Sequence, residues 1–151
     1  MASLTQKETE LLKDLRAQEQ LCIDKYTKHS AEAKDPQLKN LFTEIAQIER
    51  KHLQTIDEIA AGQTPATGGA GQSAPKFQPQ SHPMTPEDKQ ADTYLCADVL
   101  ASEKHASGLY DTSIFEFSDV ALRNVLNHIQ KEEQEHGQMI SAYMQANQMY
   151  C

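Results

Sequence analysis

The sequence predicts an all-α protein, a four-helix bundle built from two helical hairpins. Three observations carry this prediction: four segments have apolar residues at three-to-four spacing, proline and glycine gather in one central stretch, and the pattern of the first half returns in the second. A chain of 151 residues is long enough for one domain with a hydrophobic core. We therefore expect a single domain over residues 1–151, with hairpins at 5–61 and 86–147 and a linker at 62–86.

The first hairpin begins with a helix-start pattern at Thr5. The hydroxyl of Thr5 can cap the helix, and Glu8 three residues later completes a capping box. Asp35 followed by Pro36 marks the second helix start, as a capping residue and a proline at the first helical position. These two helices should fill residues 5–61.

The second hairpin begins at Thr85 and Pro86, which repeat the combination of a capping residue and a proline at the first helical position. Acidic residues follow in the first turn, where they stabilise the positive end of the helix dipole. This helix should run to about Ser113, and the fourth helix should start at Ser118 or Asp119.

Residues 62–86 separate the hairpins and cannot form a helix, because five prolines and four glycines lie among them. A bundle whose second and third helices run parallel needs a crossover along its whole length. A helix of about 25 residues is about 37 Å long, and an extended chain of equal residue number covers that distance. We therefore expect a long Pro/Gly-rich crossover. The alternative is a flexible linker between hairpins that dimerise, including a swapped arrangement.

Two copies of one pattern place acidic and histidine residues on the apolar faces of the helices. Each copy has a glutamate and, thirty residues later, a Glu-x-x-His motif whose two side chains share one helix face. Residues 11–56 aligned on 95–140 give 14 identities in 46 positions, against about 3 expected from composition. All six residues of the two patterns are among the identities: Glu19, Glu49, His52, Glu103, Glu133 and His136.

Four glutamates and two histidines from four helices are the ligand set of a di-iron or di-manganese site. Two divalent cations neutralise four carboxylates, and mixed oxygen and nitrogen ligation suits iron or manganese better than calcium or magnesium. We expect Glu49 and Glu133 to bridge the metals, with Glu19 and Glu103 as terminal ligands and one histidine on each metal. The alternative is a set of solvated Glu/His pairs on the surface.

Other residues near the proposed ligands have weaker patterns. Tyr26 and Tyr110 each lie seven residues after a ligand glutamate and are candidates to hydrogen-bond the ligands or relay electrons; the alternative is two core tyrosines. Cys22 lies one turn after Glu19 and is expected to be an inert buried thiol; the alternative is a thiol that approaches the site. The remaining flanking acids and histidines should be solvated or satisfied outside the site: Glu132, Glu135, His29, His82, His105 and His128.

Composition excludes several classes of function. The net charge of -8, without a cluster of lysine or arginine, disfavours nucleic acid and anionic membrane surfaces as partners. No apolar run is long enough to span a bilayer, and the N-terminal residues lack a signal-peptide pattern, so we expect a cytoplasmic protein. Cys22, Cys96 and Cys151 form no Cys-x-x-Cys motif, which excludes a rubredoxin-type iron site within this chain.

The six-residue set resembles that of the ferritin-like superfamily, nearest to rubrerythrin and bacterioferritin. The chain departs from rubrerythrins at Ala106, where they carry an additional carboxylate. We expect no fifth helix of the kind that a ferritin cage uses, and therefore no storage function. Three segments resemble the spore coat F family, itself ferritin-like: Glu-Gln-Leu-Cys-Ile-Asp-Lys-Tyr at 19–26, Asp-Pro-Gln-Leu-Lys-Asn-Leu-Phe at 35–42, and the tail at 143–150. This resemblance implies a spore coat location.

Two functions are consistent with these patterns. The first is a di-metal oxidoreductase, resembling a peroxidase or catalase, that reacts with peroxide or dioxygen and protects against oxidative stress. The second is a structural spore coat component whose metal site braces the bundle without turnover. The expected assembly is a homodimer or a coat-protein assembly. The second function is supported by a C-terminal Cys151 that we expect to be exposed and by the Pro/Gly-rich linker, both of which can mediate assembly. Peroxide turnover by metal-loaded protein would separate the two functions.

Overall fold

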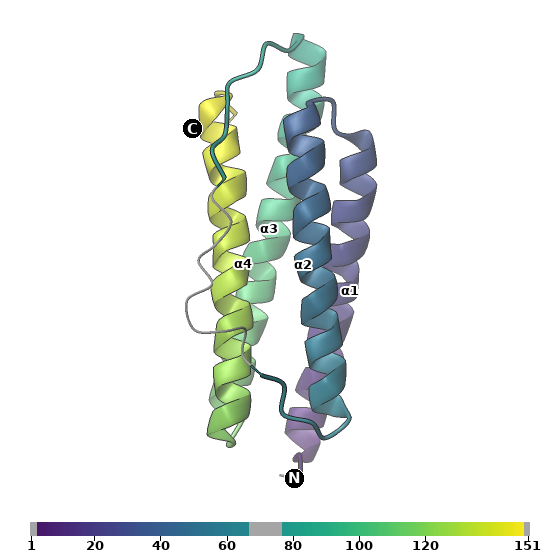
Figure 1. Ribbon diagram of the computed structural model, residues 1–151, viewed down its shortest axis with the longest axis vertical. Coiled ribbons are helices and arrows are strands. Elements are labelled where there is room, and N and C mark those ends of the chain that lie inside the picture. The colour runs from purple at the N-terminus through teal and green to yellow at the C-terminus, as the bar shows by residue number, and fades with distance from the viewer. Residues whose placement is uncertain (1–2, 67–76, 150–151) are drawn as a thin grey trace.

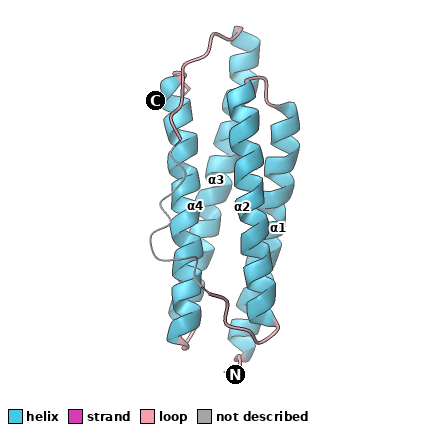
Figure 2. Ribbon diagram, viewed as in Figure 1, coloured by secondary structure: helices cyan, strands magenta, loops and turns pink. Residues whose placement is uncertain are grey.

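The computed structural model describes residues 3–66 and 77–149, and within them the chain forms four α-helices and no β-strand (Figure 2). The helices lie side by side along the long axis of the molecule (Figure 1). The prediction of an all-α four-helix bundle is confirmed. In chain order the helices are α1 (Gln6–Glu32), α2 (Pro36–Ala60), α3 (Pro86–Glu116) and α4 (Val120–Ala146).

Each helix begins at a residue whose side chain accepts a hydrogen bond from the backbone of the first turn. The predicted capping box is present, because Glu8 N–H donates to Thr5 Oγ1 at 3.0 Å and Thr5 N–H donates to Glu8 Oε1 at 2.8 Å. Asp35, Thr85 and Asp119 cap the other three helices. The predicted helix starts are therefore confirmed.

The third helix extends past its predicted end at Ser113 and stops at Glu116. The backbone N–H of Phe117, the residue after the helix, still donates to Ser113 O at 3.1 Å. The side chain of Phe117 is fully buried, and the Arg123 side chain donates to its carbonyl oxygen. The additional turn therefore delivers a large aromatic side chain to the core where α3 turns into α4.

Contacts between α1 and α3 establish the topology. Tyr26 lies beside Glu103 and Tyr110 lies beside Glu19, so later residues of one helix face earlier residues of the other. The helices α1 and α3 are thus antiparallel, and because α2 folds back on α1, α2 and α3 run parallel.

The chain must therefore cross the bundle lengthwise between α2 and α3. Residues 61–66 leave α2 at one end of the bundle, and residues 77–85 enter α3 at the other (Figure 1). The second flank is held against α4, because His82 N–H donates to Asn147 Oδ1 at 3.0 Å. The expected crossover is confirmed at both of its ends, and the middle of the predicted linker, 67–76, lies outside the described residues.

Two clusters of buried apolar side chains fill the bundle, one toward each end. On α1, Leu15 belongs to one cluster and Cys22 to the other. On α2, Ile56 belongs to the cluster of Leu15, and Ile45 belongs to the cluster of Cys22. The residues between these markers, Glu19 among them, therefore lie in the middle of the bundle, closed off by apolar packing at both ends. Among the described helices, none is long and apolar enough to cross a membrane.

Candidate metal centre

All four helices contribute to one buried polar cluster in the middle of the bundle. Its members are at most 3% exposed, and they fall into two groups in which one ligand atom from each residue lies within 4.8 Å of the others. Glu49 and Glu133 belong to both groups, as bridging ligands of two ions would. The first group is Glu19, Glu49, His52 and Glu133, and the second is Glu49, Glu103, Glu133 and His136.

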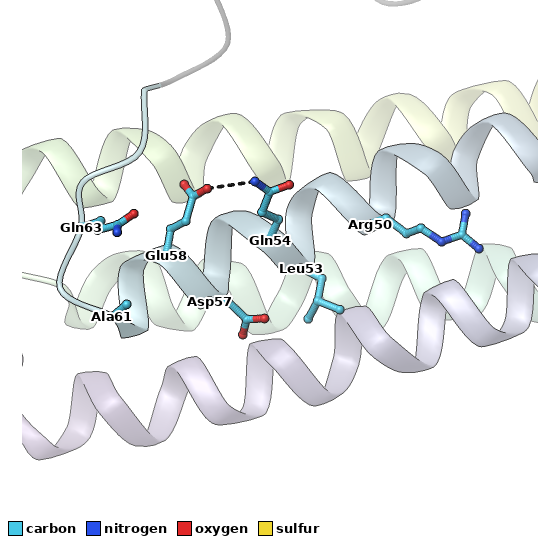
Figure 3. A pocket seen from close by; sticks show the side chains of 7 residues that line it. All are labelled: Arg50, Leu53, Gln54, Asp57, Glu58, Ala61 and Gln63. Carbon is cyan, nitrogen blue, oxygen red and sulfur yellow. Dashed lines mark hydrogen bonds between the residues drawn. The ribbon is translucent and has the colours of Figure 1, made fainter.

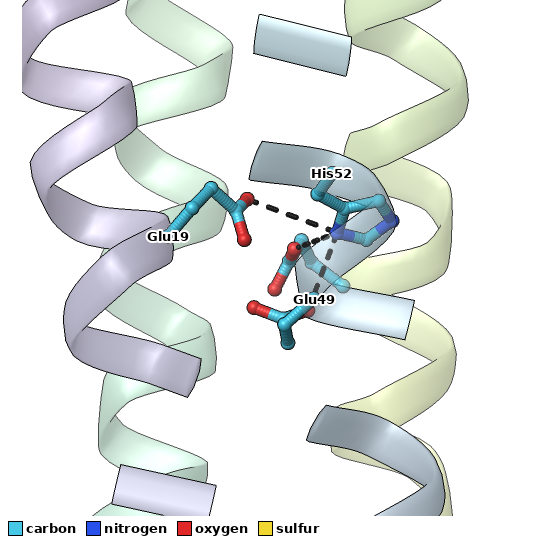
Figure 4. A group of neighbouring side chains, drawn as sticks. Glu19, Glu49 and His52 are labelled. Carbon is cyan, nitrogen blue, oxygen red and sulfur yellow. Dashed lines mark hydrogen bonds and ion pairs between the residues drawn. The ribbon is translucent and has the colours of Figure 1, made fainter. Parts of the chain in front are cut away.

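The histidines direct Nδ1 toward the carboxylates. His52 Nδ1 lies 2.9 Å from Glu133 Oε1, 3.3 Å from Glu49 Oε1 and 3.7 Å from Glu19 Oε1 (Figure 4). His136 Nδ1 lies 3.1 Å from Glu49 Oε1 and 3.3 Å from Glu103 Oε1. All six residues singled out in the sequence are thus brought together, each with one possible ligand atom facing a common centre.

Glu132 joins this cluster, contrary to the prediction that it is solvated. Glu132 Oε1 lies 3.0 Å from His52 Nε2, the ring nitrogen that faces away from the centre, and the Glu132 side chain is only 29% exposed. The prediction was wrong because it considered only the helix that carries Glu132. Glu132 does not lie on the ligand face of α4, but its side chain reaches His52 on the neighbouring helix α2. The sequence signal for this contact is that Glu132 directly precedes the candidate ligand Glu133.

The second histidine has no such partner. Among the described residues, none forms a hydrogen bond with Nε2 of buried His136. The internal repeat gives the reason, since the position 84 residues before Glu132 is Ile48. The two halves of the cluster therefore share the same ligand types but differ around their histidines.

Two tyrosines connect the halves. Tyr26 Oη donates to Glu103 Oε1 at 2.6 Å, and Tyr110 Oη donates to Glu19 Oε1 at 2.6 Å. Burial, followed by the charges of Glu103 and Glu19 respectively, raises the pKa of Tyr26 and of Tyr110 well above the usual range. Both hydroxyl groups thus stay protonated and act as hydrogen-bond donors to the candidate ligands.

The cluster leaves many polar atoms unsatisfied. Eight buried side-chain nitrogen and oxygen atoms lack a hydrogen-bond partner in the described part of the chain, and all but one belong to the six candidate ligands. A buried unsatisfied polar group costs about 1–3 kcal/mol, more when charged. Several such atoms converging on one point are what bound cations would satisfy. The residues present therefore fit a pair of metal ions in donor type, number and charge.

Burial and mutual charge perturb the carboxyl groups strongly. Burial and the charge of Glu49 raise the pKa of Glu19 to about 7, and burial with three neighbouring carboxylates raises that of Glu133 well above its usual range. Burial alone would raise the pKa of Glu49, but its contacts with the two histidines outweigh this and lower it. Without metal, the carboxyl groups therefore differ in protonation.

The pKa values of both histidines are raised, although burial alone would lower them. Burial alone would lower the pKa of His52, but its contacts with Glu132 and Glu133 raise it well above the usual range. Burial also disfavours charged His136, and its contacts with Glu103 and Glu49 raise its pKa to about 9. Protons on the imidazoles hold the metal-free cluster together in place of cations.

Residues predicted to lie outside the site mostly do so. His29 Nε2 lies 2.7 Å from Asp98 Oδ2, within hydrogen-bonding distance. His105 and His82 are exposed. Cys22 is a buried free thiol whose pKa is raised by burial, in agreement with an inert role. The predicted exposed Cys151 lies outside the described residues.

Comparison with known proteins gives one finding for the second hairpin. Residues 91–150 match the family model described as the Coat F domain. No curated protein and no solved structure matches the chain. The matched segment contains most of α3 and all of α4, and with them one half of the candidate metal centre.

Proposed function

We propose that this chain, whose residues 91–150 match the Coat F domain model, is a spore coat protein that binds a di-iron or di-manganese centre in a ferritin-like bundle. We assign to this centre a reaction with peroxide or dioxygen that protects against oxidative stress. The family match supports the spore coat location, and the buried cluster supports the metal.

One observation carries the metal proposal: six buried ligand residues converge with most of their polar atoms unpaired. A core without metal binding has no physical need for four carboxylates and two imidazoles, because desolvating them is costly. The internal repeat strengthens this argument, since each half of the chain supplies the same three residue types to the same place.

The residues divide the work of holding two ions. Glu49 and Glu133 belong to both groups and would bridge the ions. Glu19 and Glu103 would each bind one ion and are oriented by the tyrosine hydroxyls. Each histidine would bind through Nδ1. Two such ions would supply the two electrons for reducing one peroxide to water. In continued turnover without another electron donor, a second peroxide would return these electrons and leave as dioxygen.

The second candidate function is a structural coat component without turnover. It is favoured by the same geometry, because ligands from all four helices would hold the two hairpins together at mid-height. In that case the metal contributes folding free energy and no chemistry. Both candidates require metal binding and differ only in reactivity.

Hydrogen peroxide consumption separates the two candidates. We expect protein loaded with iron or manganese to consume peroxide over many turnovers, and the double variant His52→Ala, His136→Ala to lose this activity. The matched control is His105→Ala, which removes an exposed histidine of α3 outside the cluster. Full metal loading without peroxide consumption would reject the enzyme and favour the structural component.

A further inference from the structure

The internal repeat allows each hairpin to serve as a reference for the other. Each residue of α1 and α2 has a counterpart 84 positions later in α3 and α4. The contact between α1 and α2 is here called the first seam, and that between α3 and α4 the second seam. Because the cluster lies between the hairpins, a small molecule from solvent reaches it through one of the faces of the bundle.

The first seam carries an ion pair one helical turn from Glu19. Arg16 Nε on α1 donates to Asp57 Oδ1 on α2 at 2.8 Å, and this ion pair spans the seam. Leu53 of α2 is partly buried beside it. The pocket on this part of α2 includes Leu53 and Asp57 but no member of the cluster (Figure 3).

The second seam is open at the corresponding positions. A pocket of about 510 Å³ lies there, and its lining includes two residues of the buried cluster, Glu103 and Glu133, which are 2% and 0% exposed. The counterparts of Arg16 and Asp57 are Leu100 and Ser141, which also line this pocket and cannot form an ion pair. The repeat thus replaces the ion pair with two side chains that cannot form one, while a hydrogen bond that Gln130 Nε2 on α4 donates to Ser107 O on α3 at 2.9 Å joins the two helices beside the pocket.

Gly137 accounts for much of the remaining space. Its counterpart in the first seam is Leu53, so the second seam lacks a whole leucine side chain at this position. A Cβ added at Gly137 would meet only Leu100 Cδ1, at an ordinary contact distance of 3.7 Å. A Cβ therefore fits here at an ordinary contact distance, and because Gly137 lines the pocket, we expect a larger side chain to extend into it. Glycine in the interior of a helix destabilises it relative to alanine. A need to keep the pocket open would explain why glycine occupies this position.

We infer that the second seam is the entrance to the proposed metal centre, and that Gly137 keeps it open for a small uncharged polar oxidant such as hydrogen peroxide. This inference rests on the proposed function. Hydroxyl and amide groups in the lining, such as those of Ser107 and Gln138, can hydrogen-bond a neutral molecule. The charged lining residues are Lys104, Glu103 and Glu133, so the lining carries both signs of charge and does not select for an ion of one sign.

A thiol placed at the inner side of the pocket tests the entrance without any metal. In a Cys151→Ser background, Glu103→Cys puts the thiol in the second seam, and Glu19→Cys puts it at the counterpart position behind the first. Methyl methanethiosulfonate, a small uncharged reagent, then reports access by mass spectrometry. We expect the thiol introduced by Glu103→Cys to react at least tenfold faster than that introduced by Glu19→Cys. The native buried Cys22 and Cys96 provide an internal baseline.

Substitution at Gly137 then closes the entrance. Adding Gly137→Leu to Glu103→Cys should slow labelling at least tenfold, Gly137→Ala should slow it much less, and Leu53→Gly in the first seam should leave it unchanged. Melting curves should show Gly137→Leu to be at least as stable as the parent. Labelling at the parent rate in Gly137→Leu would overturn the inference.

A second test uses protein that keeps all six candidate ligands. Gly137→Leu alone should keep the wild-type metal content yet slow the oxidation of the iron-loaded protein by hydrogen peroxide at least tenfold. Wild-type protein that takes up no metal would reject the proposed function, while the thiol measurement would still decide whether the second seam is open. Unchanged oxidation in Gly137→Leu would reject the entrance and leave the proposed function intact.

Discussion

Tyr26 on α1 donates a hydrogen bond from its hydroxyl group to Glu103 Oε1 on α3 at 2.6 Å, so a residue of the first hairpin orients a candidate ligand of the second. Tyr110 does the same for Glu19 in the opposite direction. The two halves of the cluster are therefore assembled only when the hairpins are docked. Metal binding and hairpin docking should be coupled for this reason.

Removing one of these tyrosine hydroxyl groups should weaken both metal binding and the docking of the two hairpins. Tyr26→Phe deletes a hydrogen bond to a buried acidic group, which contributes about 1.5–3 kcal/mol when the acceptor is charged. We expect urea denaturation to show a loss of this order in the free energy of unfolding of metal-free protein, with weaker metal binding in addition. Tyr94→Phe removes a tyrosine hydroxyl at a side chain that is 71% exposed and serves as the control. Equal stability of the two variants would contradict the role of Tyr26.

Glu132→Gln should make the two metal positions differ further. Partners that hydrogen-bond the outer nitrogen of a ligand histidine typically contribute about 10–100-fold to metal affinity. Glu132 contacts His52, which would bind only one of the two ions. We therefore expect Glu132→Gln to lower the metal affinity at that ion's position and not at the other. Competition with a chelator should resolve a weakened first ion and an unchanged second. Glu135→Gln, beside the other histidine, is the control, and an equal effect of both variants would reject this account.

The metal-free protein should become less stable as the pH rises from about 5 to 9. A group whose pKa is raised by folding stabilises most below its unfolded pKa and loses this contribution as the pH passes the folded pKa. The pKa of Glu19 rises from 4.5 to about 7 and that of His136 from 6.5 to about 9, so their windows are pH 4.5–7 and 6.5–9. Glu133 and His52 act in the same direction.

Glu49 has the opposite sign, but its contribution changes only below pH 4.5, outside this range. Bound metal should remove or reverse the trend, because it holds the ligands deprotonated. Melting temperatures of metal-free and metal-loaded protein across pH 5–9 check this. Parallel profiles for the two forms would argue against a metal in the cluster.

Shortening the crossover should change the assembly and leave the helices intact. Five residues reach only about 18 Å, less than the length of a 25-residue helix. A chain whose linker at 62–86 is cut to five residues should form a domain-swapped dimer, with one hairpin from each chain in each bundle. A Gly/Ser linker of the original length should stay like the wild type. Light scattering on the eluting protein measures the mass, and a short-linker monomer with full metal content would contradict the crossover topology.

Local features were the most predictable from sequence. The capping box of Thr5 and Glu8 depends on residues three apart, and the structure reproduces it. The six cluster residues could be selected because the repeat placed them at equal spacing, independent of any tertiary detail. Helix patterns and charge balance were therefore sufficient for the bundle and for the members of its polar centre.

Relations between helices were less accessible. That Tyr26 reaches Glu103, and not its own Glu19, depends on the register of α1 against α3, which no local pattern encodes. Glu132 was assigned to solvent because its partner His52 lies on another helix. The open second seam also became visible only when Gly137 and its counterpart Leu53 were placed in space.

Metal content tests the central claim most directly. We expect wild-type protein incubated with ferrous iron or with manganese(II), and then freed of unbound metal, to retain two ions per chain by elemental analysis. The double variant His52→Ala, His136→Ala should retain none, while remaining helical by circular dichroism. Wild-type protein that stays metal-free after incubation with either ion would contradict the account, because the buried carboxylates and imidazoles would then have only one another as partners.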